Sequence, residues 1–156
     1  MPLRKSRRYY RKLIEKAKGA QKLAFAPYSH YAVGAAVLSG SGKVYTGCNI
    51  ESPTLISHSC AERSAIVHAI SHGERVIEAV CTVSRASEPC GACRQMIREF
   101  SVGETEIISV HLDPETGKAK VLRTTIGRLL PHAHTASVLD VDLESPDGSK
   151  PSKAAA

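Results

Sequence analysis

Residues 60–94, which read CAERSAIVHAISHGERVIEAVCTVSRASEPCGACR, decide the fold. The apolar spacing after Cys60 predicts a helix that Gly73 closes, and residues 76–84 form the nearly continuous apolar run of a buried strand. A second helix is expected over residues 91–100. A helix, a strand and a helix in a right-handed crossover bring both helix N-termini to one edge of the sheet, so we expect Cys60, Cys90 and Cys93 to meet there.

The rest of the chain predicts a mixed sheet with helices on both faces. We expect an amphipathic helix over residues 6–26, which Pro27 stops, and a hairpin of two strands over residues 31–38 and 43–50. A second antiparallel pair is expected over residues 105–112 and 119–123, followed by a short helix over residues 125–130. Together these elements predict an α/β fold, a three-layer α-β-α sandwich with a mixed five-stranded sheet.

Length and composition fit one compact domain, since the 156 residues are 42% hydrophobic and 23% charged. We expect this domain over residues 1–134, and a mobile tail over residues 135–156, where Asp, Ser, Pro, Lys and Ala dominate. No run has the length of a membrane span, and the first thirty residues lack the apolar stretch of a signal peptide. We therefore expect a cytoplasmic protein without a membrane partner.

The formal charge is +6, and the basic residues are concentrated over residues 4–18, at the first predicted helix. A basic helix face can bind nucleic acid, but a solvated face explains the same charges. Aromatic residues make up only 4% of the chain, so the stacking surfaces that usually hold single strands are scarce. We do not expect a nucleic-acid partner.

The cysteines point to a metal centre. Five is an odd number, which favours metal ligands or buried thiols over a disulfide framework. Cys60, Cys90 and Cys93 are predicted to hold zinc (Zn2+), because thiolates are soft ligands and a catalytic zinc usually has three protein ligands and an open position for water. Cys48 and Cys81 have no partner at such spacing, and we expect both to be buried small side chains.

Glu62 lies two residues after a predicted ligand, so its carboxylate can face the open coordination position. It is the candidate proton shuttle; the alternative is a first-turn glutamate that only favours the helix dipole. Arg63 is expected to donate hydrogen bonds to a ligand sulfur, with a surface ion pair as the alternative. His58 is an alternative ligand, but it precedes the helix in a loop, where we expect a loop or interface residue.

Four motifs resemble the free-nucleoside cytidine deaminases and occur in the order PYSHYAVGAA at 27–36, GCNIE at 47–51, CAER at 60–63 and PCGACRQ at 89–95. The resemblance covers residues 10–134, and the zinc deaminase signature includes a three-cysteine variant with a glutamate that is not a ligand. It implies hydrolytic deamination of cytidine or deoxycytidine, a role in pyrimidine salvage, and usually a homotetramer in which neighbouring subunits complete each pocket. It also implies Asn49 and Glu51 at the ribose, with Tyr31 and the backbone of Ala61 at the base.

Three residues depart from the family pattern. Leu55 stands where small tetrameric members commonly have tyrosine, and His134 stands where they have a phenylalanine that stacks on the pyrimidine. Tyr31 replaces the usual phenylalanine. These changes alter the expected wall of the substrate pocket. They leave open that the substrate is a related compound, such as a modified cytidine, a free aminopyrimidine or a cytosine-nucleoside antibiotic like blasticidin S. A non-catalytic zinc module that binds RNA through the first helix also stays open.

Overall fold

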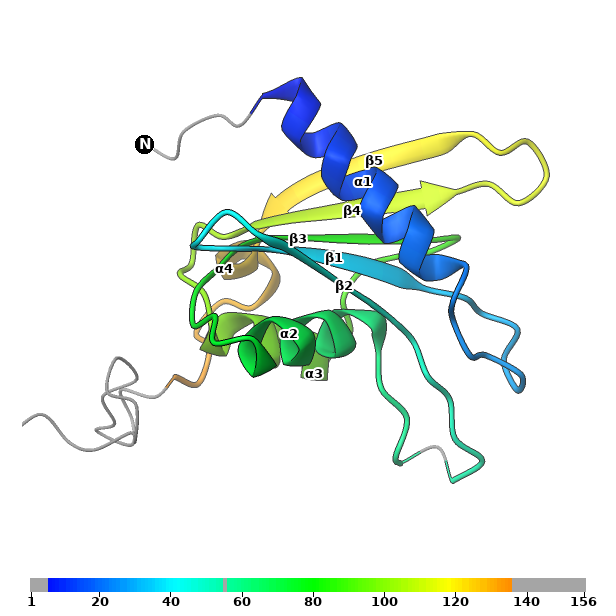
Figure 1. The fold of residues 1–156 in the computed structure, drawn as a ribbon, viewed down its shortest axis with the longest axis horizontal. Coiled ribbons are helices and arrows are strands. Elements are labelled where there is room, and N and C mark those ends of the chain that lie inside the picture. Colours follow the sequence, from blue (N-terminus) through cyan, green and yellow to red (C-terminus); the bar gives the residue numbers. More distant parts are fainter. Residues whose placement is uncertain (1–5, 55, 136–156) are drawn as a thin grey trace, which may run out of the picture.

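The computed structural model describes residues 6–54 and 56–135. These residues contain four helices and five strands, whose arrangement is drawn in Figure 1. They are α1 (Arg7–Gln21), β1 (Gly34–Ser39), β2 (Val44–Cys48), α2 (Ala61–Ser71), β3 (Ile77–Ser84), α3 (Gly91–Glu99), β4 (Glu106–Leu112), β5 (Ala119–Thr125) and α4 (Ile126–Leu129). The predicted order of elements is therefore confirmed.

The strands form one five-stranded sheet in the order β2-β1-β3-β4-β5. β1 pairs antiparallel with both β2 and β3, and β4 pairs antiparallel with β5. β3 and β4 are parallel, because α3 carries the chain back across the sheet between them. The mixed sheet and its two antiparallel hairpins agree with the sequence-based prediction.

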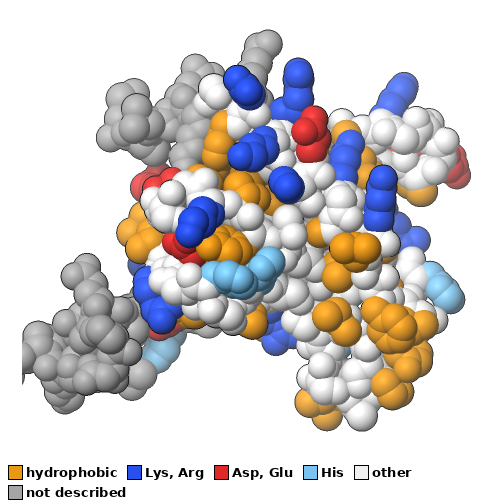
Figure 2. Space-filling model, in the orientation of Figure 1, with side chains coloured by type: hydrophobic (Ala, Val, Ile, Leu, Met, Phe, Trp, Pro, Cys, Tyr) orange, Lys and Arg blue, Asp and Glu red, His pale blue; other side chains and the backbone are white. Residues whose placement is uncertain are grey.

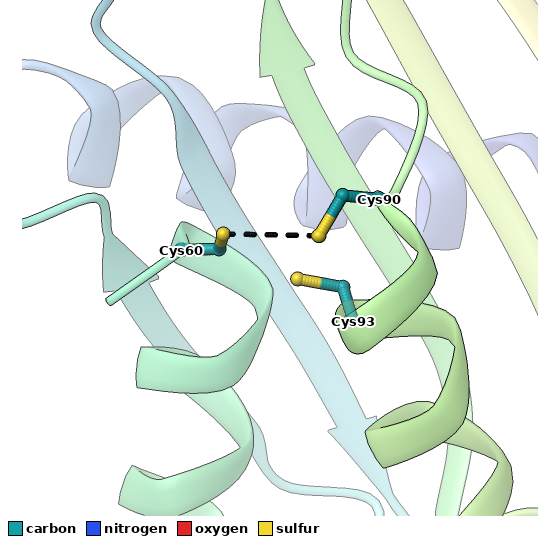
Figure 3. Close-up of side chains that lie close together, drawn as sticks. All are labelled: Cys60, Cys90 and Cys93. Carbon is teal, nitrogen blue, oxygen red and sulfur yellow. Dashed lines mark hydrogen bonds between the residues drawn. The ribbon is translucent and has the colours of Figure 1, made fainter. Parts of the chain in front are cut away.

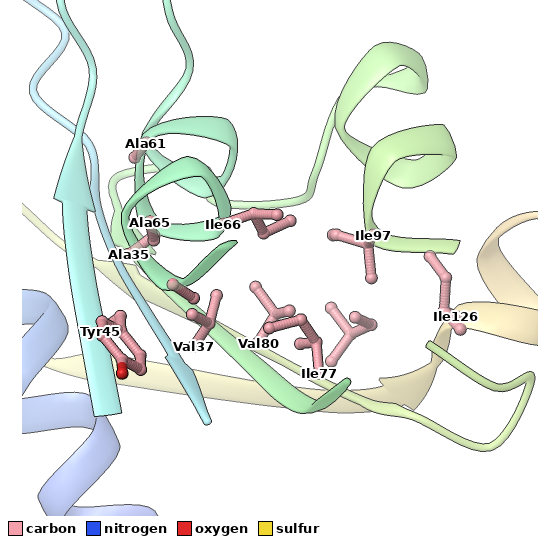
Figure 4. Packing of buried hydrophobic residues seen from close by; sticks show 12 residues of the cluster. Ala35, Val37, Tyr45, Ala61, Ala65, Ile66, Ile77, Val80, Ile97 and Ile126 are labelled. Atoms are coloured by element: carbon pink, nitrogen blue, oxygen red, sulfur yellow. The ribbon is translucent and has the colours of Figure 1, made fainter. Parts of the chain in front are cut away.

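The central strands β1 and β3 are buried on both faces, as a three-layer sandwich requires. Along β1, Ala35 and Val37 belong to the core cluster that packs against α2 and α3, which Figure 4 shows from close by. Ala36 and Leu38 alternate with them and belong to the opposite cluster, under α1. Side chains of a strand point alternately to the two faces, so α1 covers one face while α2 and α3 cover the other.

Two glycines let helices lie directly on the sheet. A Cβ atom on Gly47 of β2 would come within 2.3 Å of the backbone nitrogen of Ala65 in α2. A Cβ atom on Gly34 of β1 would come within 2.1 Å of the carbonyl oxygen of Ala17 in α1. Only a glycine allows a helix to approach a strand this closely. The contact at Gly47 sets how close α2, the helix that starts after Cys60, lies to the sheet.

The helix predicted over residues 6–26 ends earlier, at Gln21. Its start is as predicted, since the Ser6 side chain accepts a hydrogen bond from the backbone of Tyr9. The end differs because Phe25 pairs with the chain beyond β2: its N–H donates to the carbonyl of Asn49, and its own carbonyl accepts from Glu51. This long-range pairing draws the chain away from the helix before Pro27.

Several smaller predictions are corrected. β1 begins at Gly34 and not at residue 31, and β2 ends at Cys48 and not at residue 50. Cys81 is buried as predicted, but Cys48 is only partly buried, with its sulfur 3.4 Å from the carbonyl oxygen of Leu23. Leu55 and all of the predicted tail except residue 135 lie outside the described residues. Across the described segments, no helix combines the length and apolarity needed to cross a membrane.

Candidate active site

The three predicted zinc ligands lie together between the starts of α2 and α3 (Figure 3). Cys60 is the N-cap of α2, Cys90 is the N-cap of α3, and Cys93 lies in the first turn of α3. Their sulfur atoms all lie within 4.8 Å of one another, and those of Cys60 and Cys90 are 4.0 Å apart. Thiolates bound tetrahedrally to a single zinc ion are about 3.8 Å apart, so the group fits that ion.

The surroundings favour negative charge within this group, at Cys60 in particular. The N-termini of two helices point toward them, and the partial positive charge of a helix N-terminus stabilises an anion. Hydrogen bonding with Cys93 and Cys90 and the nearby charge of Arg63 lower the pKa of Cys60. The same hydrogen bonding and burial raise the pKa of Cys93. The thiols thus interact as one unit, which is suited to binding a soft dication.

Glu62 lies beside this group. Its side chain is only 5% exposed, and its Oε2 atom is 3.6 Å from the sulfur of Cys93. Burial raises the pKa of Glu62 to about 7. A carboxyl group with a pKa near neutrality can both accept and release a proton under ordinary conditions. The position suits a proton shuttle better than a group that only interacts with the helix dipole.

A cavity of about 280 Å³ opens in front of these side chains. The residues that line it include the predicted metal ligands Cys60 and Cys90 and the predicted proton shuttle Glu62. They also include the predicted substrate contacts, which are Tyr31, Asn49, Glu51 and Ala61. These residues come from the loop before β1, the segment after β2 and the starts of two helices. The fold therefore brings almost all of the predicted site residues to one pocket.

The Asn49 side chain bridges two strand ends. Its Oδ1 accepts a hydrogen bond of 2.8 Å from the backbone N–H of Val33, and its Nδ2 donates one of 2.8 Å to the carbonyl of Tyr31. These bonds add to the backbone pairing beyond the ends of β1 and β2, where the Asn49 N–H donates to the Val33 carbonyl at 3.2 Å. Asn49 therefore fixes the segment that carries Tyr31 into the cavity.

The Glu51 carboxylate also binds the segment before β1 that carries Tyr31. It accepts hydrogen bonds from the backbone N–H groups of Tyr28 and Ser29, at 3.0 and 3.1 Å, and from the Ser29 hydroxyl. The bond from Ser29 is the main cause that lowers the pKa of Glu51. Because the carboxylate stays ionised, it can accept further hydrogen bonds from the cavity side.

Residues 7–109 match the family model of the cytidine and deoxycytidylate deaminase zinc-binding region. The chain belongs to this deaminase family. It is 39% identical over 136 residues to a cytidine deaminase of Sporosarcina psychrophila, an alignment that covers 85% of this chain and 96% of that protein.

Solved structures of the family share the fold. The cytidine deaminase of Burkholderia pseudomallei superposes with a TM-score of 0.70 and 37% identity, over 80% of this chain and 98% of that chain. The cytidine deaminase of Mycobacterium tuberculosis gives a TM-score of 0.67 and 32% identity, over 80% and 95%. The chain is thus a zinc-dependent hydrolase of the cytidine deaminase family, which argues against the non-catalytic RNA-binding module.

The sequence reasoning missed one part of this deaminase pocket, the loop between β3 and α3. Ser87 and Glu88 both line the cavity. The Ser87 side chain is only 3% exposed, and no described residue offers its hydroxyl a hydrogen bond. Glu88 lies 3.1 Å from the imidazole of His111. The available signal was their position, directly before the Pro89 and Cys90 that begin the second ligand motif.

Arg63 binds the chain just before α2. Its guanidinium donates a 2.9 Å hydrogen bond to the carbonyl of His58, and its buried Nε has no hydrogen-bond partner among the described residues. Its predicted bond to a ligand sulfur stays a prediction. His58 lines the cavity from this loop but is not part of the three-sulfur group.

The helix α4 and the chain that follows it are hydrogen-bonded to α3. Arg94 donates hydrogen bonds to the carbonyls of Pro89 and Leu129, at 2.8 and 3.1 Å. Gln95 donates a 2.8 Å hydrogen bond to the carbonyl of His134, whose side chain is exposed. His134, which we predicted to stand at the family's stacking position, is therefore anchored by its backbone to α3.

Proposed function

We propose that the chain deaminates cytidine and deoxycytidine hydrolytically, giving uridine or deoxyuridine and ammonia. The observation that carries the proposal is the buried carboxyl of Glu62 beside three cysteine sulfurs, at a cavity that Asn49 and Glu51 also line. The relatives named above are cytidine deaminases, which supports this choice of substrate.

Cys60, Cys90 and Cys93 would hold zinc as thiolates, and their spacing and helix N-terminal setting fit that ion. When bound, zinc would polarise a water molecule and lower its pKa toward neutrality. The protein's own part is to orient the substrate, exclude bulk water and move protons.

Glu62 would move two protons in sequence. It first takes a proton from the attacking water and gives it to N3 of the pyrimidine, while the oxygen bonds to C4. It then takes the second proton of that oxygen and gives it to the amine on C4, so the C–N bond breaks and ammonia leaves with a carbonyl in its place. A pKa of about 7 suits one carboxyl group to both halves of this exchange.

The loops around the cavity would hold the nucleoside. Asn49 and Glu51 retain acceptor or donor capacity beyond the hydrogen bonds they make within the protein, so they can bind ribose hydroxyls. Tyr31 would pack against the base, and the backbone of Ala61 would bind its edge. The Tyr31 hydroxyl donates to the carbonyl of Ala86, which fixes the ring against the opposite loop.

The test is ammonia release by the zinc-loaded protein with cytidine, deoxycytidine, cytosine, 5-methylcytidine and blasticidin S. We expect turnover of the first two. Turnover confined to another compound would keep the chemistry and attribute the changed specificity to the departures at Leu55 and His134. Absence of turnover across the panel at full zinc content would overturn the proposal.

We also propose a homo-oligomer, and a tetramer in particular. Exposed apolar side chains gather on the two loops that flank the cavity, and Figure 2 shows hydrophobic side chains on this part of the surface. They are Leu23, Phe25, Tyr28, Ile50 and Ile56. Apolar groups on neighbouring loops favour association. Light scattering should give a tetramer mass, and Ile56→Lys should lower it; a monomer in the wild type would contradict this assembly.

The five cysteines are all free thiols in the structure. Free thiols, three of them suited to a metal, are typical of a reducing compartment. This supports a cytoplasmic location, and we propose that the enzyme recovers pyrimidine nucleosides there. Fractionation of cells that produce the tagged protein would test the compartment.

A further inference from the structure

A second set of metal-binding side chains lies near the C-terminal end of α2. His68 and His72 are four residues apart on this helix, so they share one face of it. Both are exposed, and their ring centroids are 4.9 Å apart. Figure 2 shows histidine side chains together on the surface over α2.

The hydrogen bonds of the two rings define which nitrogen is free. His68 Nδ1 lies 3.0 Å from the carbonyl oxygen of Thr46, and His72 Nδ1 lies 2.8 Å from the carbonyl oxygen of His68. A carbonyl oxygen can only accept, so each Nδ1 carries the hydrogen. In the neutral ring the lone pair is then on Nε2. Histidines that bind metals usually have this arrangement, with the other ring nitrogen donating to a backbone carbonyl or carboxylate.

Tyr45 supports both rings from the sheet side. Its ring centroid lies 5.2 Å from that of His68 and 5.5 Å from that of His72. Tyr45 is only 7% exposed, and its hydroxyl donates a 3.0 Å hydrogen bond to the buried carboxylate of Glu74. The histidines thus rest on a fixed aromatic ring, which limits the rotamers that metal binding would have to select.

We propose that His68 and His72 form a second metal site, which binds a divalent late transition ion through two Nε2 atoms. Imidazole pairs suit copper, nickel and zinc, and water molecules would complete the coordination. His72 is roughly 18 Å along the helix from Cys60, so the site is separate from the three-cysteine group. This inference does not depend on which substrate the enzyme deaminates.

A bound ion would link two successive turns of α2. His72 is the C-cap residue of that helix, where the last turn is held by fewer backbone hydrogen bonds than its middle. A metal that binds the folded helix and not the unfolded chain stabilises the fold by mass action. The expected effect is therefore on thermal stability, while deamination continues at the other end of the helix.

Nickel titration of the zinc-loaded protein tests the proposal. By isothermal titration calorimetry, we expect the wild type to bind Ni2+ without releasing its zinc. His68→Asn and His72→Asn should each weaken that binding at least about tenfold, and the double variant should abolish it. The control His132→Asn removes an exposed histidine after α4, at a positive φ that asparagine tolerates, and should leave nickel affinity unchanged.

A second measurement keeps the test independent of folding defects. Saturating Ni2+ should raise the Tm of the wild type and of His132→Asn, but not that of the double variant, and all three should retain deaminase activity without nickel. Equal nickel binding by the wild type and the double variant would overturn the proposal. So would a wild type that binds no nickel beyond its zinc-loaded centre.

Discussion

Glu62 of α2 and Cys93 of α3 meet between the two helix N-termini, where the glutamate Oε2 is 3.6 Å from the cysteine sulfur. The acid therefore lies beside a predicted ligand from the other helix, although Cys60 is closer in sequence. Both side chains are buried. Their contact depends on how α2 packs against α3, and Ile66 and Ile97 join these helices within one core cluster.

Glu62→Gln should remove activity and leave the metal in place. The amide has nearly the same shape but cannot accept and return a proton, so we expect kcat to fall about 100- to 10,000-fold. Zinc content should not change, because three sulfurs remain. Ammonia release and zinc analysis on the same preparation give both quantities.

The exposed Glu104 provides a matched control for that substitution. Glu104→Gln makes the same chemical change away from the cavity, and its activity should equal that of the wild type. Near-normal turnover in Glu62→Gln would remove Glu62 from the mechanism.

Cys90→Ser should lose zinc. A serine hydroxyl is a harder and weaker ligand than a thiolate, and ligand loss loosens chain that the metal holds together. Zinc content after dialysis and Tm should both decrease. Cys48→Ser is the control, because Cys48 lies outside the three-sulfur group and donates to the carbonyl of Leu23. Equal zinc loss in both variants would indicate a general folding defect and not a ligand role for Cys90.

The sequence predicted the part of the site that depends on local pattern. Cys60, Cys90 and Glu62 lie at helix starts, and a helix start is set by its own neighbours. The crossover between the two helices then brings these starts together, as the handedness rule for parallel strands requires. In the structure β3 and β4 pair in parallel, which is the arrangement that such a crossover produces.

The parts that it missed depend on long-range contacts. The early end of α1 follows from Phe25 pairing with Asn49, a partner twenty-four residues away in the chain. Ser87 enters the cavity because of how its loop folds back, with its carbonyl accepting a hydrogen bond from Thr82. The spacing of apolar residues along the chain contains no information on such contacts. The ends of the elements and the loop residues that line the cavity therefore became clear only from the structure.

Asn49→Ala should weaken both stability and substrate binding. The substitution leaves the Val33 N–H and the Tyr31 carbonyl without their partner, which we expect to cost about 1–3 kcal/mol of unfolding free energy. The released loop carries Tyr31, so KM should rise by more than kcat falls. Urea unfolding and steady-state kinetics measure the two effects. A variant with normal stability but raised KM would limit Asn49 to the substrate contact.

Glu74→Gln should change how stability depends on pH. Hydrogen bonds from Ser41, at 2.6 Å, and Tyr45 hold the pKa of Glu74 below its ordinary value of 4.5. A lowered folded-state pKa gives stability that is present above the unfolded pKa and is lost as pH falls through the folded one. The wild type should therefore melt higher than the variant at pH 7, and the difference should shrink below pH 4.5. A difference that stays constant with pH would contradict the role of the ionised carboxylate.

Two glycine substitutions should have opposite effects, and they test whether the depth of α2 sets the site. Gly47→Ala puts a methyl group within 2.3 Å of the Ala65 backbone, so α2 must move outward, and we expect a loss of about 3 kcal/mol or more. Gly19→Ala lies within α1 with nothing near its new Cβ, and should stabilise by about 0.5–1 kcal/mol through helix propensity. Because α2 carries Cys60 and Glu62, only the first variant should also lose zinc and activity. If Gly47→Ala kept full activity at a temperature where it remains folded, the position of α2 on β2 would not govern the catalytic geometry.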